Sequence, residues 1–473
     1  MPFIIAIAGL ALAVWGFVFL LRGSLLHGTV VFLVAGCCFN EYLFKVDVGP
    51  ISLTLERIVL ALLCIAYAVQ RCLGHTDPKK LQNGDVLLAG FLGVLVVSLL
   101  TGEQAAGLKG EVPPHWRFLA GYLMPAVIYW IARQSKLTER RVYGVLAALA
   151  GLGLYLSLTG MLEVAGQWSL VFPRHIADPK LGLHFGRARG PMLQSVSFGT
   201  FVYAGLFSAW FWRDRLNRLG QVAVCLVLPL FAAGIFFSYT RSVWMGAALA
   251  LFVVAALTLH RSWRPLVLGG MIGAALLLVT FKSDAFLGFQ REYSASETRD
   301  SASLRVSFAY VSWQMFLDRP IMGCGLGRFA QEKLPYLSDR STAIPLERIR
   351  TLVHHNHYLS LLTETGLIGF SLFAALMCVW AVDAWKMVRH AGTPDWIRGI
   401  AVLFLAMLSV ILFQWMGHEL SYSPIDHSLL FLLAGMTAGL RPQAYRVEQE
   451  TLAQRAAEPH ADDVNHPLPV LPV

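Results

Sequence analysis

Hydrophobic residues in this chain form long, uninterrupted runs of about 18 to 22 positions, and short polar connections separate them. A run of this length can cross a bilayer as a helix, which satisfies its own backbone polar groups in lipid. We therefore predict an all-α, polytopic helical membrane protein with about 12 to 14 transmembrane helices. The expected spans cover approximately 3–21, 28–44, 51–70, 85–101, 117–132, 142–161, 195–212, 219–239, 243–259, 264–281, 358–385, 397–416 and 427–440.

The longer polar stretches divide the chain into four parts. Residues 1–281 are expected to form a transmembrane bundle, 282–357 one large loop, and 358–440 the C-terminal membrane helices. Residues 441–473 are rich in proline and charge and lack a helical period, which predicts a disordered cytoplasmic tail. No segment has the composition of a soluble domain.

Charge placement gives the expected orientation. Only 14% of residues are charged, against about 25% in soluble proteins, and the net charge is +9. Lys and Arg collect in alternate connections, a pattern typical of cytoplasmic loops, so the positive charge does not indicate nucleic-acid binding. These connections are 71–80, 133–141, 213–218, 260–264 and 386–398. The connections 102–116, 162–194, 282–357 and 417–426 should then face outward.

The number of spans determines on which side of the membrane the N-terminus is expected. Thirteen spans with a cytoplasmic tail place the N-terminus outside, whereas the N-terminus is inside if the first two hydrophobic runs are not two full spans. The first run has no basic residues before it, unlike a signal peptide, so we read it as a retained membrane helix.

The large outward loop contains a predicted helix followed by a glycine run. Four apolar residues spaced to share one helical face, Leu304, Phe308, Val311 and Met315, precede Pro320. This helix should lie on the membrane surface or cap the bundle. The glycines Gly323, Gly325 and Gly327 permit tight turns or a close approach of the backbone to a ligand, and a plain turn is the favoured reading.

Three histidines close the loop. His354, His355 and His357 surround Asn356, and a neutral imidazole can accept a proton from an alcohol at neutral pH. A metal ion shared by His355 and His357 is disfavoured, because no carboxylate or cysteine close in sequence completes such a site. Glu364, near the start of the next span, can orient a histidine, hold an arginine or cap the helix.

Several arginines fall on the outward side, against the positive-inside bias. Their guanidinium groups match phosphate oxygens, which suggests a phosphorylated substrate carried by the membrane. Pairing with loop acids such as Asp284, Glu292 and Asp318 remains an alternative. The outward arginines are Arg187, Arg189, Arg241, Arg305 and Arg328.

Five stretches resemble one family. The pair His355-Asn356, followed after nine residues by Gly366-Leu367-Ile368-Gly369, resembles the HN-x9-GxxG signature of the O-antigen ligase and O-antigen (exopolysaccharide) polymerase superfamily. The stretch DRPIMGCGLGRF resembles its Pro-x-x-Gly-x-Gly-x-Gly-x-Phe element. SYTRSVW, with Arg241, resembles its Ser-x-Ser-Arg turn, and RARGPMLQSVSFG resembles, less closely, its Arg-x-x-Gly-x-x-x-x-Pro element. Arg305 stands where the family has an arginine before a Trp-containing helix.

The resemblance implies an integral-membrane transferase with a fold like that of the type C glycosyltransferases, in the bacterial inner membrane with its active site facing the periplasm. The donor would be a glycan on undecaprenyl pyrophosphate. His355 would be the general base, while Arg241, Arg305 and one of Arg187 or Arg189 would hold the pyrophosphate. No metal or other cofactor is implied. The acceptor, which is lipid A–core, a growing polysaccharide or a protein, stays open between a ligase and a polymerase.

Two other classes of function remain. A lipid-glycan flippase or transporter usually carries ionisable residues near the bilayer midplane, whereas charges here gather near span ends. A structural or sensory membrane protein has no need for outward arginines around histidines. We therefore favour the transferase.

Overall fold

The computed structural model describes residues 21–48, 51–101, 112–183, 185–281 and 295–445, together with residues 16 and 18. Most of the expected first span, residues 282–294 of the large loop and residues 446–473 of the tail lie outside the described residues.

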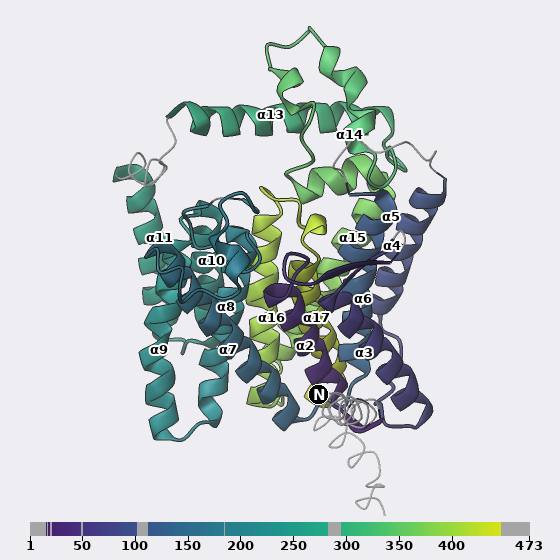
Figure 1. Ribbon diagram of the computed structural model, residues 1–473. Helices are drawn as coiled ribbons and strands as arrows, with labels where there is room; N and C mark the ends of the chain where they lie inside the picture. The colour runs from purple at the N-terminus through teal and green to yellow at the C-terminus, as the bar shows by residue number, and fades with distance from the viewer. Residues whose placement is uncertain are drawn as a thin grey trace, which may run out of the picture.

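The described chain is a bundle of helices (Figure 1). Those of the N-terminal half are α2 (Leu25–Cys38), α3 (Leu55–Cys72), α4 (Asn83–Leu100), α5 (Pro114–Phe118), the π-helical turn η1 (Leu119–Leu123), α6 (Met124–Gln134), α7 (Glu139–Val164) and α8 (Ser195–Trp212). Those of the C-terminal half are α9 (Arg218–Phe237), α10 (Arg241–Thr258), α11 (Arg264–Phe281), α13 (Ala295–Asp318), α14 (Phe329–Glu332), α15 (His357–Arg389), α16 (Asp395–Gln414) and α17 (Pro424–Ala444). Short 3₁₀ turns are η2 (Arg174–Ala177), η3 (Arg213–Arg215), η4 (Leu334–Ser338), η5 (Leu346–Ile349) and η6 (Leu420–Tyr422).

The predicted all-α membrane fold is confirmed. Each predicted span after the first overlaps a described helix, and 195–212 coincides with α8. Among the described residues, six helices are long and apolar enough to cross a membrane: α4, α7, α9, α10, α15 and α16. The total number of membrane crossings stays a prediction.

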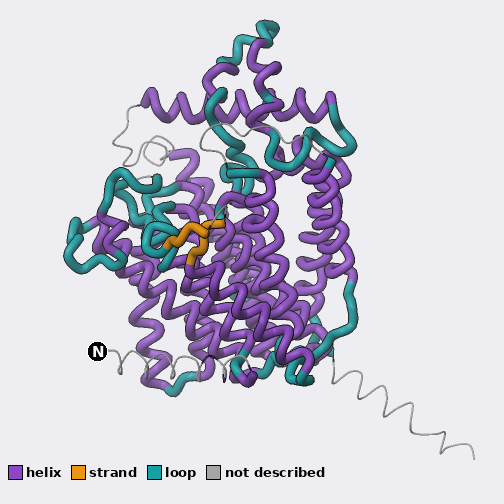
Figure 2. Tube along the Cα trace, turned by 45° about the vertical axis from the view of Figure 1, so that its right-hand side comes forward, coloured by secondary structure: helices purple, strands orange, loops and turns teal. Residues whose placement is uncertain are grey.

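One predicted span begins with strand instead of helix. Lys45–Val48 (β1) pairs antiparallel with Ile51–Thr54 (β2), and Figure 2 shows this ribbon on the side of the bundle. Valine, isoleucine and threonine alternate here with Asp47 and Ser52, which face each other across the ribbon and hydrogen-bond. Such β-branched alternation favours strand over helix. Helix α3 therefore begins only at Leu55.

The centre of the bundle is formed by α16 and α17, which are buried along most of their length. Helix α17 packs on α6 through Gly435 and Gly439, one helical turn apart. A Cβ atom on Gly435 would lie 2.4 Å from the carbonyl oxygen of Tyr129, and one on Gly439 would lie 2.8 Å from that of Arg133. Small residues at this spacing let two membrane helices approach backbone to backbone.

The two ends of the bundle differ. Helix α13 lies across one end, where the segments 319–356 and 415–423 also lie (Figure 1). We call this the loop end and the opposite end, where α17 finishes, the far end. The predicted face of α13 is confirmed, since Phe308, Val311 and Met315 are buried in a small core with residues of the following loop. Helix α13 therefore caps the bundle.

The last helix is slightly longer than the sequence indicated. Residues 441–444 continue α17, because Arg441 pairs with Asp383 at 3.0 Å and Gln443 donates to the Leu137 carbonyl. The predicted tail boundary at 441 thus falls within the helix.

Candidate functional site

The site is built on a break in α15. Gly366 has φ 62° and ψ −164°, so the helix is interrupted and its neighbouring peptide groups lose their helical partners. The glycine loop supplies new ones. The amides of Cys324 and Gly325 donate to the carbonyls of Thr363 and Glu364 at 2.8 and 3.0 Å. The two sequence motifs are therefore the two halves of one backbone junction.

Glycine is required on both sides of this junction. A Cβ atom on Gly366 would lie 2.3 Å from the Ile321 carbonyl oxygen, and one on Gly323 would lie 2.5 Å from the carbonyl carbon of Glu364. Both residues also have positive φ. Gly325 and Gly327 share that conformation, with φ of 105° and 72°. The glycine run thus forms turns that dock on α15, in agreement with the favoured reading. Gly369 lies buried just beyond the break, beside Thr365.

Asn356, the residue after His355, fixes the start of α15 through both ends of its side-chain amide. Its side-chain oxygen accepts the amide of Leu359 at 2.9 Å, which caps the first turn of α15. Its Nδ2 donates to the carbonyl of Met416, also at 2.9 Å. The amide of His357 likewise donates to Trp415 O. The start of α15 is therefore fixed to the turn formed by residues 415–419.

His354 and His357 point into the protein. The pKa of His354 is lowered to about 3, chiefly by burial, and its ring lies 3.6 Å from that of Phe329. The ring of His357 is fully buried, and its Nδ1 lies 2.8 Å from Glu419 Oε1. Neither ring is placed to meet a substrate.

His355 is the exposed member of the three. One side of its ring contacts Phe308 edge to face at 5.3 Å. The reduced hydration there, followed by the positive charge of Arg305, lowers the pKa of His355 below its ordinary value. The ring therefore lies at the surface of the loop end in surroundings that favour its neutral form.

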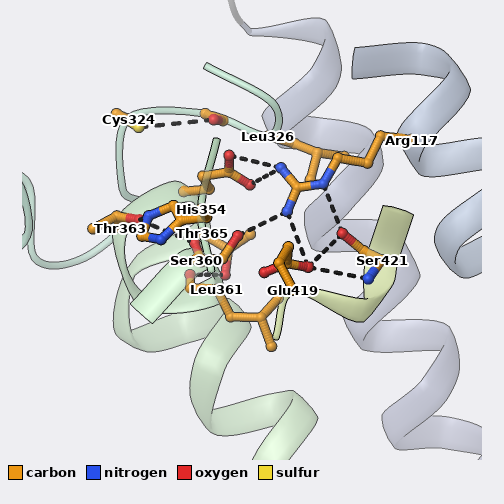
Figure 3. A network of polar contacts seen from close by, with 12 residues as sticks. Arg117, Cys324, Leu326, His354, Ser360, Leu361, Thr363, Thr365, Glu419 and Ser421 are labelled. Atoms are coloured by element: carbon orange, nitrogen blue, oxygen red, sulfur yellow. Dashed lines mark hydrogen bonds and ion pairs between the residues drawn. The ribbon is translucent and has the colours of Figure 1, made fainter. Parts of the chain in front are cut away.

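A buried arginine anchors the whole arrangement. The guanidinium of Arg117 is 1% exposed and binds both oxygens of Glu364, at 2.7 and 2.5 Å. Figure 3 shows it reaching Ser360, Ser421 and Glu419 as well, at 2.7, 2.8 and 3.5 Å. Of the three roles open to Glu364, the structure thus selects the holding of an arginine.

Glu419 links this arginine to His357. Burial alone would raise the pKa of the Glu419 carboxyl, but His357 and Arg117 hold it well below its ordinary value. Neither Arg117 nor Glu419 was singled out by the sequence analysis. Arg117 carries the signal that was used for the other arginines, a basic residue at the outward end of a span. Glu419 carries none, because only the fold brings residue 419 beside residue 357.

The turn 415–419 also reaches the remaining arginines. A Cβ atom on Gly417 would lie 3.9 Å from Nη2 of Arg305, which is exposed on α13. On the other side, His418 Nε2 lies 3.3 Å from the hydroxyl of Ser242, the residue after Arg241 at the start of α10. His355, Arg305 and Arg241 therefore gather around one turn, although they are separated widely in sequence.

The segment with Arg187 and Arg189 joins the same region through the backbone. The amide of Ala188 donates to the carbonyl of Phe237, just before the turn that leads to Arg241. Arg189 is 1% exposed, and its guanidinium donates to the carbonyls of Leu181, Ile176 and Asp178.

The side chain of Arg189 therefore has a structural role in holding its own loop. Its backbone amide, like that of Gly190, donates to Glu163 Oε2. Arg187 is half-buried and directly precedes Ala188, whose amide makes that bond to Phe237. Arg328, also half-buried, caps α14, and its side chain packs against Gly325.

The arrangement offers one neutral base beside cationic groups on a surface of low hydration. Such a site can accept a proton from an alcohol and stabilise developing negative charge. Among the described residues, no group of three or more His, Cys, Asp or Glu side chains is placed to hold a metal ion. Independence from metal stays a prediction.

Comparison with known proteins matches one family model. Residues 225–374 match the model described as O-antigen ligase. The match runs from α9 into α15, so it contains Arg241, Arg305, the glycine loop, the His-Asn pair and the break at Gly366. Arg117, Arg187 and the turn 415–419 lie outside it. No curated protein matches the chain.

Proposed function

We propose that the chain, whose residues 225–374 match the O-antigen ligase family model, transfers a glycan from undecaprenyl pyrophosphate to the hydroxyl of an acceptor sugar. The observation that carries the proposal is the exposed ring of His355, which lies beside Arg305. The next residue, Asn356, bonds to the turn 415–419, and this turn contacts Ser242, the residue after Arg241. A superfamily of membrane ligases and polymerases handles lipid-linked glycans and their acceptors, and this site has the chemistry for both.

In the proposed reaction, the oxygen of the acceptor hydroxyl attacks the anomeric carbon of the donor glycan while His355 takes the proton of that hydroxyl. The bond from this carbon to the phosphate oxygen breaks, and undecaprenyl pyrophosphate departs with the electron pair. Attack opposite the leaving group inverts the anomeric centre. The proton on His355 then passes to water, because its lowered pKa disfavours the imidazolium.

The arginines act on the leaving group. Pyrophosphate gains negative charge as the bond breaks, and fixed guanidinium groups stabilise that charge without reorganisation. We assign this role to Arg305 and Arg241. For the third contact we choose Arg187 over Arg189, because Arg187 is half-buried whereas Arg189 is only 1% exposed.

The side of the membrane follows from charge and fold together. The basic connections 71–80, 133–141, 213–218 and 260–264 join helices at the far end, while the candidate site lies at the loop end. Lys and Arg favour the cytoplasmic side. We therefore place the far end in the cytoplasm and His355 in the periplasm of a bacterial inner membrane.

Deletion of the gene tests the proposal and separates ligase from polymerase. We favour a ligase, whose loss leaves lipid A–core without attached polysaccharide on a gel of surface glycans. Loss of a polymerase leaves core with a single repeat or abolishes a secreted polysaccharide. The wild-type gene should restore the pattern and the His355→Ala gene should not. A surface glycan profile that is unchanged on deletion contradicts the proposal.

A further inference from the structure

An apolar slot lies on the side of the bundle, away from the candidate site. It has a volume of about 640 Å³ and opens between α3 and α4 over α6. Its walls include Cys64 and Tyr67 of α3, Val86 and Leu92 of α4, and Val127 of α6. The one acidic group in the lining, Asp85, is satisfied internally by Arg133 and Tyr129 at 2.8 Å each. The slot is therefore shaped and lined for hydrocarbon.

The position of the slot along the bundle identifies the leaflet that it meets. Helix α4 begins at the far end and reaches the loop end near Ser98, whose hydroxyl accepts the amide of Leu326. The slot extends along α4 only as far as Leu92. Six residues correspond to about 9 Å of helix, so the slot lies in the half of the bundle remote from His355.

Two cations neighbour residues of the slot lining in sequence. Arg71 follows Tyr67 by four residues, so the two share a face of α3, and Lys80 directly precedes the lining residue Leu81. Both side chains are exposed, and neither makes an ion pair with any described residue. Trp130 Nε1 donates to Tyr67 OH at 2.9 Å, which ties α6 to α3 inside the slot. An apolar slot whose lining residues are followed or preceded by exposed cations matches an anionic lipid.

We propose that this slot binds one acyl chain of an anionic phospholipid from the leaflet opposite the candidate site, with the lipid phosphate between Arg71 and Lys80. The slot itself is independent of the glycan-transfer proposal, and only the choice of a phospholipid over a prenyl chain rests on that proposal. A prenyl tail of a donor at His355 enters from the other leaflet, which is why we choose phospholipid as the occupant.

Native mass spectrometry and thermal unfolding of the purified full-length protein test this site. The probes are phosphatidylglycerol and phosphatidylcholine with identical acyl chains, added to detergent-solubilised protein. Wild-type protein should retain one more phosphatidylglycerol than phosphatidylcholine, and phosphatidylglycerol should raise its Tm more.

Two variants dissect the site. Ala89→Trp places an indole in the slot at an exposed lining position and should lose the bound lipid. The double variant Arg71→Ala, Lys80→Ala should weaken phosphatidylglycerol binding roughly 10- to 30-fold and leave phosphatidylcholine binding unchanged.

Matched controls separate the site from general effects. Ala61→Trp adds the same indole at an exposed position of α3 outside the slot lining, and Lys136→Ala with Arg261→Ala removes two exposed far-end cations. Both controls should behave as wild type. The proposal is overturned if Ala89→Trp binds lipid like Ala61→Trp, if the two lipids act equally on wild type, or if the lipid lost from Ala89→Trp is a polyprenyl phosphate.

Discussion

His355 differs from its two histidine neighbours in where its ring lies, not in its residue type. His354 packs in the interior and His357 hydrogen-bonds Glu419 there, whereas His355 is exposed next to Arg305. The sequence identified the histidine through its Asn neighbour and the glycines that follow. It could not show which rings are buried, because burial depends on Phe308 and Phe329 from other segments.

The lowered pKa of His355 predicts the pH dependence of transfer. The base acts when neutral, so kcat/KM should rise with pH through a pKa below the ordinary value of about 6.5 and then stay level. Removing the positive charge of Arg305 makes protonation of His355 easier and so raises its pKa. The rise of kcat/KM with pH should therefore occur at higher pH in Arg305→Ala than in wild type. Arg340→Ala, an exposed loop control, should leave the limb in place. An acid limb above pH 7 in wild type is the contrary outcome.

Arg117 should matter for stability more than any exposed charge of the loop end. Arg117→Ala leaves Glu364 and Glu419 buried with a deficit of positive charge, at a cost of about 3–5 kcal/mol. Arg117→Lys keeps the charge but lacks the further donors that reach Ser360 and Ser421, so it should lose less stability than Arg117→Ala. Thermal unfolding in detergent measures both.

The control for this prediction is Arg350→Ala. It breaks an exposed pair with Glu347, with side chains 54% and 44% exposed, and should change stability by less than about 1 kcal/mol. Equal Tm values for Arg117→Ala and Arg350→Ala would show that the buried network does not hold the site together.

At the scale of elements, the chain joins a broken helix to a glycine loop. The sequence predicted α13 and its buried face because the apolar spacing is local to one helix. It also marked the glycines as a turn. It could not show that the turn is stabilised by the carbonyls of Thr363 and Glu364, about 40 residues further along, since the break in α15 is required first.

Gly366→Ala tests that junction. The added Cβ meets the Ile321 carbonyl at 2.3 Å and sits at φ 62°, so stability should fall by at least about 2 kcal/mol. Gly93→Ala in α4 is the matched control, because nothing lies within 4 Å of its Cβ; it should be neutral or stabilising by about 0.5–1 kcal/mol. Thermal unfolding of the two variants measures this difference in stability. A Gly366→Ala protein as stable as Gly93→Ala would show that the junction does not require glycine at position 366.

At the scale of the whole molecule, hydrophobic runs predicted the helices well because each run must satisfy its own backbone in lipid. Contacts between distant segments could not be predicted in this way. Arg117 meets Glu364 across 247 positions, and the turn 415–419 joins α15 to α10. These contacts assemble residues that the sequence had identified one at a time.

The central claim is that His355 is the base of a glycan transfer at the loop end. The most direct test is transfer by purified protein from an undecaprenyl-pyrophosphate-linked glycan to an acceptor, with wild type, His355→Ala and His260→Ala compared. His260 is an exposed histidine at the far end, so its variant should keep full activity. His355→Ala should lose roughly 10²- to 10⁴-fold in kcat with unchanged Tm. A His355→Ala protein that transfers as fast as wild type would contradict the account.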